Sequence, residues 1–173
     1  MKTIKFLTTL IAIVLYSFQS FSQGFPDGNY KGLILGLHGL AGHTSYKFEN
    51  THSGMSFGAG GYIGYGFSEQ FLLNFRVRWA MTDADGFENN TVMWSGDVSY
   101  FPVLDKGFYL NGGVGPILNA PEFGNPKTGF GIYAGAGYEI IKKLSIGFDY
   151  TYASFEDDLK GNTIAVYLRF LFY

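Results

Sequence analysis

Residues 71–82 alternate between apolar and polar side chains so regularly that they constrain the fold more than any other stretch. One set holds Phe71, Leu73, Phe75, Val77, Trp79 and Met81, and the other holds Leu72, Asn74, Arg76, Arg78, Ala80 and Thr82. Successive side chains of a strand point to opposite faces, so the pattern predicts a strand with one apolar and one mostly polar face. A soluble protein would turn the apolar face inward, whereas a membrane barrel would turn it toward lipid.

Composition favours a sheet that is poor in charge. Aromatic residues make up 19% of the chain and charged residues only 15%, and there are 25 glycines. Soluble chains are typically about 25% charged, and helices favour Ala, Leu, Glu and Lys over Gly and aromatic residues. The absence of cysteine excludes disulfides, thiolate metal sites and thiol nucleophiles. With a net charge of -2 and no basic patch, no nucleic-acid partner is expected.

The first 22 residues have the parts of a secretory signal peptide. Lys2 and Lys5 precede an apolar run over residues 6–16, and Ser20 and Ser22 are small residues two positions apart. We expect cleavage after Ser22, a short lead-in over residues 23–31 and a barrel domain over residues 32–173. The alternative, a membrane anchor, is disfavoured because the run is too short to cross about 30 Å of hydrocarbon.

Eight strands are predicted, with connections that alternate between long polar and short. Their ranges are 32–42, 55–67, 71–82, 91–101, 107–118, 129–140, 144–153 and 163–173. Their lengths suit tilted strands that cross a bilayer, which need roughly 9–11 residues. Long loops at one end and tight turns at the other are typical of outer-membrane barrels. The predicted fold is therefore all-β, an eight-stranded antiparallel up-and-down transmembrane β-barrel.

Large aromatic side chains gather near the ends of the apolar faces. We expect them at the two lipid interfaces, as in transmembrane barrels. They are Phe67, Phe71, Trp79, Trp94, Tyr100, Phe108, Tyr138, Tyr152 and Phe172. A soluble barrel is the remaining alternative, but its surface would then be the second face, which carries too few charges for a soluble surface.

The second face would line the lumen. Its charged residues are Arg76, Arg78, Arg169, Asp97, Glu139 and Asp149, three of each sign. Ion pairs among them are expected, because unpaired charges in a confined interior are costly. An eight-stranded barrel is only wide enough to be filled by its side chains or to hold one small ligand. A wide aqueous pore is therefore not expected.

The alternation of glycine with aromatic and aliphatic residues over residues 129–138, and the closing Arg169-Phe170-Leu171-Phe172, resemble the small outer-membrane β-barrels of the OmpA/OmpX type. The resemblance covers about residues 30–173. It implies the outer membrane of a Gram-negative bacterium, contact with outer-membrane lipid, and recognition of the C-terminal strand by the barrel-assembly machinery. Because the chain ends at Tyr173, either Phe172 or Tyr173 is the terminal aromatic that this machinery would read.

Two barrels that resemble this class modify lipid A with His and Ser near the outer leaflet. The candidates here are His38, His43 and His52 with Ser45, Ser53 and Ser95, but no carboxylate is evident that would orient a histidine. Two acidic groups, Asp83-Asp85-Glu88 and Glu156-Asp157-Asp158, lack the remaining ligands of a calcium loop and are expected to be solvated. Glycines that alternate with strand residues form no phosphate loop, so no cofactor is expected.

The sequence thus predicts a non-enzymatic outer-membrane protein that acts through its outer loops, in surface contact or envelope integrity. A narrow porin-like channel for a small or apolar solute and a lipid A-modifying enzyme are the alternatives. No specific ligand is defined, because a fold does not determine an activity.

Overall fold

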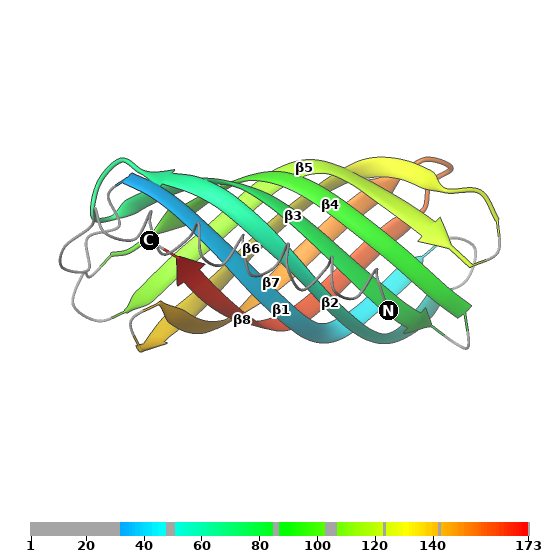
Figure 1. Cartoon of the computed structure of the whole chain (residues 1–173). Coiled ribbons are helices and arrows are strands. Elements are labelled where there is room, and N and C mark those ends of the chain that lie inside the picture. The colour runs from blue at the N-terminus through cyan, green and yellow to red at the C-terminus, as the bar shows by residue number, and fades with distance from the viewer. Residues whose placement is uncertain are drawn as a thin grey trace, which may run out of the picture.

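The computed structural model describes residues 32–47, 51–84, 87–102, 107–122, 124–141 and 143–172. These form eight strands that close in sequential order into one antiparallel barrel (Figure 1). The strands are β1 (Gly32–Lys47), β2 (Thr51–Gly66), β3 (Phe71–Ala84), β4 (Phe87–Tyr100), β5 (Phe108–Pro121), β6 (Lys127–Ile141), β7 (Leu144–Phe155) and β8 (Lys160–Phe172). The predicted fold class is confirmed, while the predicted signal peptide and lead-in lie outside the described residues.

The strand register fixes the width of the barrel. Following cross-strand partners from Ile34 on β1 around all eight strands returns to β1 at Thr44, a stagger of ten residues. For eight strands, this stagger corresponds to a tilt of about 43° and a backbone radius of about 8 Å. The interior therefore has room for inward side chains and little else. In the part of the chain that the structure describes, no helix is long and apolar enough to span a membrane.

The strands are longer than predicted at one end of the barrel, which we call the distal end. There β1 continues to Lys47, β2 begins at Thr51, and β3 and β4 are joined through residues 85–86 alone. The predicted alternation of long and short connections is wrong, since the longest link, residues 101–107, lies at the opposite, C-terminal end. The polar residues read as loops instead continue the ladder, because a closed barrel supplies each strand with hydrogen-bonding neighbours on both sides.

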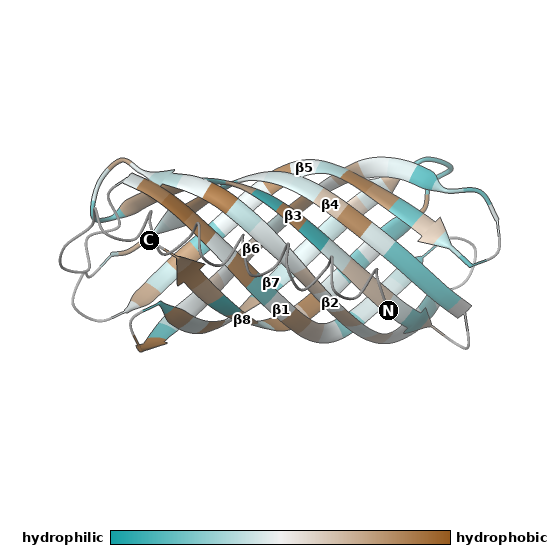
Figure 2. Ribbon diagram, viewed as in Figure 1, coloured by the Kyte–Doolittle hydropathy of each residue, from teal (hydrophilic) through white to brown (hydrophobic). Residues whose placement is uncertain are grey.

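The outward face is apolar through the middle of every strand. Leu37, Phe57, Phe75, Ile132 and Phe148 are among its exposed side chains. The structure places all nine predicted interface aromatics on this face, six of them exposed and Tyr100, Tyr152 and Phe172 half-buried. Hydrophilic residues replace the apolar ones toward the distal end, as the teal right-hand end of β4 shows in Figure 2.

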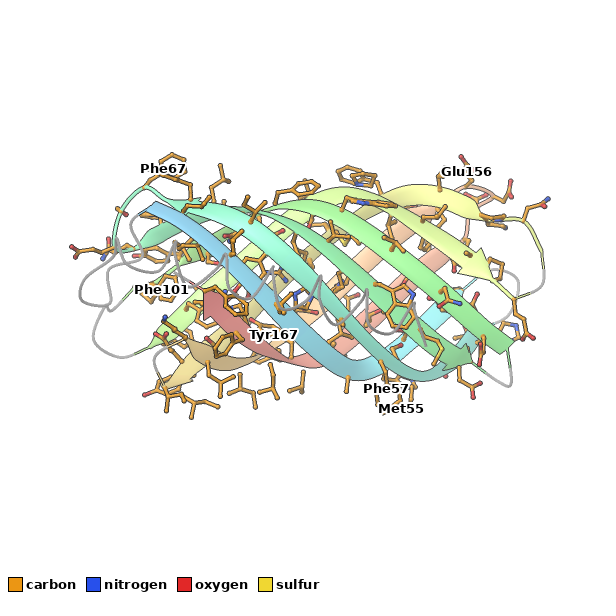
Figure 3. The ribbon with its side chains drawn as sticks, in the orientation of Figure 1. Met55, Phe57, Phe67, Phe101, Glu156 and Tyr167 are labelled. Carbon is orange, nitrogen blue, oxygen red and sulfur yellow. The ribbon has the colours of Figure 1, made fainter. Side chains whose placement is uncertain are left out.

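The inward face, predicted to be mostly polar, is layered. An apolar cluster that includes Ile34, Leu72, Phe101 and Leu171 occupies the C-terminal part of the lumen. A second apolar cluster, with Tyr46, Met93, Ile117 and Phe155, lies toward the distal end. In Figure 3, Phe101 and Tyr167 lie within the barrel toward the end that carries Phe67, and Glu156 marks the distal end. The buried charges lie between these two clusters.

Tyrosine rings fill the lumen by packing over glycines of the neighbouring strand. Tyr62 is directly opposite Gly36, Tyr109 opposite Gly137, Tyr133 opposite Gly113 and Tyr167 opposite Gly147. In each pair, a Cβ added to the glycine would collide with the ring. Glycine is therefore required at these positions so that the tyrosine ring can approach the neighbouring strand. The rings in turn cover backbone atoms that have no side chain over them.

Candidate functional site: the lumen and the distal rim

The first buried ion pair joins adjacent strands. Arg76 Nε on β3 lies 2.6 Å from Asp97 Oδ2 on β4, and the carboxylate of Asp97 is fully buried. These two atoms form an ion pair, but their geometry is not that of a hydrogen bond. The second carboxylate oxygen accepts a hydrogen bond from Ser95 Oγ at 2.7 Å. Asp97 is thus held from two directions, and its charge is compensated in a site that water does not reach.

The second ion pair crosses the lumen from β3 to β7. Arg78 Nη1 donates to both oxygens of Asp149 at 3.2 and 3.1 Å, and Nη2 donates to Thr151 Oγ1 at 2.6 Å. The ring of Tyr133 lies within cation–π distance of both arginines, with its centroid 4.8 Å from Arg76 Cζ and 5.7 Å from Arg78 Cζ. Two ion pairs and an aromatic ring therefore close the middle of the barrel.

The remaining two predicted lumen charges, Arg169 and Glu139, do not form an ion pair with each other. Arg169 is buried and stacks on Tyr109, with Cζ 3.9 Å from the ring centroid. Glu139 lies at the C-terminal end near the β6–β7 turn, where its Oε1 accepts a hydrogen bond from the backbone N–H of Lys143. The structure thus brings four of the six charges into two pairs and leaves Glu139 outside this network.

A chain of hydroxyl groups, which the sequence reading missed, lines one side of the lumen on the distal side of the charges. Thr44 Oγ1 is 2.8 Å from Thr163 and 2.5 Å from Ser56, and Ser56 Oγ is 2.7 Å from Thr82 Oγ1. The chain links β8, β1, β2 and β3. In the sequence, each of these four strands has a Ser or Thr at an inward position. Only the strand register shows that these residues lie at the same height along the barrel axis.

Two spaces follow toward the distal end. A small cavity of about 30 Å³ lies beside Arg78 and the hydroxyl chain. A larger opening of about 240 Å³ at the distal mouth is lined by His52, Asn89, Asn119 and Lys127, among others. Tyr46 lines both spaces, which therefore lie next to one another.

The candidate catalytic residues are scattered between the two faces of the barrel. His38 is buried in the lumen, and Ser95 is bonded to Asp97. His43 and Ser45 lie one residue apart on the outward face of β1, with Ser53 opposite Ser45 in the register. This His-x-Ser spacing is a signal that could have been read from the sequence. The register neighbours of His43 are Met55 and Ile164, so neither adjacent strand places a carboxylate beside it.

The acidic groups at the distal rim remain solvated. Asp83 and Glu88 are directly opposite in the register and both are exposed. Glu156 accepts a hydrogen bond from Thr128, and Asp157 pairs with Lys127 at 3.3 Å. Within the described ranges, no three His, Asp or Glu side chains gather as a metal site would require; Asp85 lies outside them.

The comparisons with known proteins agree with this architecture. A family model described as "Outer membrane protein beta-barrel domain" matches residues 8–172. The chain belongs to this family. It is a transmembrane outer-membrane β-barrel of the Gram-negative envelope, and its apolar outward face contacts lipid.

Solved structures resemble the outer-membrane barrel in fold. Neisserial surface protein A is 14% identical with a TM-score of 0.61, and the match covers 79% of this chain and 96% of that one. Ail, the attachment invasion locus protein of Yersinia pestis, is 14% identical with a TM-score of 0.61, covering 82% and 99%. Ail in complex with the heparin analogue sucrose octasulfate matches with a TM-score of 0.56, at the same identity and coverage. No curated protein matches the sequence.

Proposed function

We propose that this barrel is a non-enzymatic outer-membrane protein that acts through its distal end, which faces the cell exterior, in surface contact or envelope integrity. The observation that carries the proposal is the closed lumen. Both buried ion pairs and the Tyr133 ring occupy its middle, and the cavity beside them holds only about 30 Å³. That space is far smaller than the roughly 300–1,000 Å³ of a typical small-molecule site.

A narrow channel is disfavoured by the same contacts. An ion or solute that passed through the lumen would have to separate Arg78 from Asp149, the pair that crosses it. Breaking a buried pair leaves an uncompensated charge and costs about 3–5 kcal/mol. The distal rim, by contrast, is already exposed and polar, so contact with a partner there needs no such rearrangement.

The charge of the distal rim indicates which partners it suits. The described rim has six exposed carboxylates, on Asp83, Glu88, Glu122, Glu156, Asp157 and Asp158, and three lysines, Lys47, Lys127 and Lys160. An acidic rim attracts cationic surfaces and repels polyanions. We therefore propose a cationic or uncharged partner, in contrast to the sulfated ligand of the Ail complex.

The proposal predicts that rim charge matters for the protein's role in the cell. In a strain that lacks the protein, the wild type should restore adhesion to a cationic surface and survival in detergent. The triple change Asp83→Asn, Glu88→Gln and Glu122→Gln should lose most of the restored adhesion at low salt, because it removes half of the exposed rim carboxylates. The matched control is Glu69→Gln, which removes one carboxylate at the C-terminal end and should behave as wild type.

Two outcomes would contradict the proposal. Discrete openings of the purified protein in a planar bilayer would show that the lumen conducts and would favour the narrow channel. A change in lipid A mass on expression that is lost in His43→Ala but kept in His52→Ala would show catalysis at the outward His43 and Ser45. Both substitutions remove one exposed histidine near the distal end, so His52→Ala is the control for His43→Ala.

We also propose that the barrel-assembly machinery reads the outward aromatics of β8. Phe170 is exposed and packs edge-on against Phe172, with ring centroids 4.9 Å apart. Phe172→Ala should lower the fraction of chain that reaches the outer membrane in a heat-modifiable, folded form. An unchanged folded fraction would leave Tyr173 as the terminal aromatic instead.

A further inference from the structure

Arg169 is a buried cation with no anionic partner among the residues that the structure describes. Its side chain is 2% exposed, and its Nε and Nη2 have no hydrogen-bond acceptor. The carboxylates of Asp97 and Asp149 are already paired with Arg76 and Arg78, and no described carboxylate lies within salt-bridge distance of Arg169. An isolated charge in a protein interior costs several kcal/mol, so a folded barrel requires some compensation at this site.

The polar groups around Arg169 can each donate a hydrogen bond, although they are neutral and can also accept one. Tyr109 stacks on its guanidinium, and Tyr62 and Tyr167 belong to the same cluster of the lumen as Tyr109. The hydroxyl groups of Tyr62 and Tyr109 are buried, and neither is in a well-aligned hydrogen bond with a described residue. Ser145 and His38 are the cross-strand neighbours of Arg169, and Ser145 Oγ and both ring nitrogens of His38 are also unpartnered.

The stacking of Arg169 on Tyr109 compensates this charge only in part. A cation–π contact contributes about 2 kcal/mol when it is desolvated, which is less than the penalty for an unpaired buried charge. This contact provides no hydrogen-bond acceptor for the N–H groups of the guanidinium or for the tyrosine hydroxyl groups, because the ring face attracts the cation without accepting a particular hydrogen bond. Among the described residues, the site has neutral acceptors but no acceptor with negative charge.

We propose that a small inorganic anion of the chloride class is bound in the lumen against Arg169. It would accept hydrogen bonds from the guanidinium and from the hydroxyl groups of Tyr62 and Tyr109, and would leave the lumen with a balance of charge. A monatomic ion fits this interior better than an organic one, because the Tyr109 ring lies 3.9 Å from Arg169 Cζ and the side chains around the guanidinium are buried. This site is independent of the proposed role of the distal rim.

The C-terminal apolar cluster explains how the ion would be retained. Phe101, Leu72 and Leu171 lie in the same cluster as Tyr62 and Tyr109 and are almost fully buried. An ion in this place is enclosed during folding, so its exchange afterwards is slow. The experiment must therefore supply the anion while the barrel folds.

Protein folded in sodium bromide should give one anomalous bromide peak within hydrogen-bond distance of Arg169 in a crystal. At equal ionic strength, thermal unfolding should occur at a higher temperature in bromide or chloride than in gluconate, which is too large for the site. At an anion concentration ten times the dissociation constant, we expect a rise of about 4 °C in Tm.

Two variants should remove this anion dependence by opposite means. Arg169→Met removes the cation, and His38→Glu places a carboxylate on the residue opposite Arg169 in the register. Lys160→Met, which removes an exposed cation of β8, is the matched control and should keep the full rise. If one lumen variant fails to fold, the other and the bromide crystal still decide the question.

The proposal fails if the bromide crystal shows only water beside Arg169. It also fails if all variants keep the same rise in Tm, which would identify a general salt effect. A peak at Arg76 or Arg78 alone would likewise contradict it, because those arginines already have carboxylate partners.

Discussion

Asp97→Asn should destabilise the barrel by about 3–5 kcal/mol, although asparagine has the same shape as aspartate. The substitution removes the carboxylate that lies 2.6 Å from Arg76 Nε and leaves a buried guanidinium without its counter-charge. Asparagine can still accept the hydrogen bond from Ser95, so the loss comes from the charge and not from an empty space. Urea unfolding in lipid vesicles measures the change.

The exposed ion pair at the distal rim provides the matched control. Lys127 and Asp157 lie 3.3 Å apart, but the Asp157 side chain is 72% exposed. Exposed pairs contribute only about 0–1 kcal/mol, so Asp157→Asn should have little effect. In the double variant Arg76→Met/Asp97→Asn, the cost should be smaller than the sum of the two single costs, because neither charge is then left alone. Additive costs would show that the two groups do not interact.

The faces of the strands could be predicted from the sequence because the two-residue period is a local property. Arg76 and Arg78 alternate with Phe75, Val77 and Trp79, and the structure indeed places the arginines inside. The same two-residue period could not show which inward positions belong to apolar layers and which to the charged layer. Leu72 and Leu171 share a face with the charged residues and are fully buried at its C-terminal end.

The partners of the lumen charges could not be predicted, because they depend on register and stagger. Asp97 is on the strand next to Arg76, but Asp149 reaches Arg78 from four strands away along the chain. Such a contact requires a closed barrel with a definite tilt. For the same reason the sequence could not show that Arg169 lacks a carboxylate, even though three acidic residues were assigned to its face.

The predicted strand ends at the distal end differ from the observed ones for a physical reason. Residues 43–47 include His43, Thr44, Ser45 and Lys47, which read as a loop by composition. In the barrel, β2 and β8 pair with this segment on both sides as far as Lys47. Backbone pairing there is independent of side-chain polarity, so the rim of these strands is built from paired backbone.

Gly147→Ala should cost about 2–3 kcal/mol, the second-largest effect that the structure predicts. A Cβ at this position would lie 2.5 Å from Cζ of Tyr167 and 2.7 Å from the backbone oxygen of Ala136. The strand cannot move away, because Gly147 is paired with Gly137 on one side and Tyr167 on the other. The Tyr167 ring must therefore leave its position and lose its hydrogen bond to Asn111.

Gly96→Ala is the matched control, since a Cβ there would have no neighbour within 4 Å and would point outward. It should be neutral, or stabilising by about 0.4–1 kcal/mol through the loss of unfolded-state freedom. In a Tyr167→Ala background, Gly147→Ala should cost less than in the wild type, because only the contact with Ala136 remains. An unchanged cost would mean that the ring yields freely, and that the glycine is needed for the backbone approach alone.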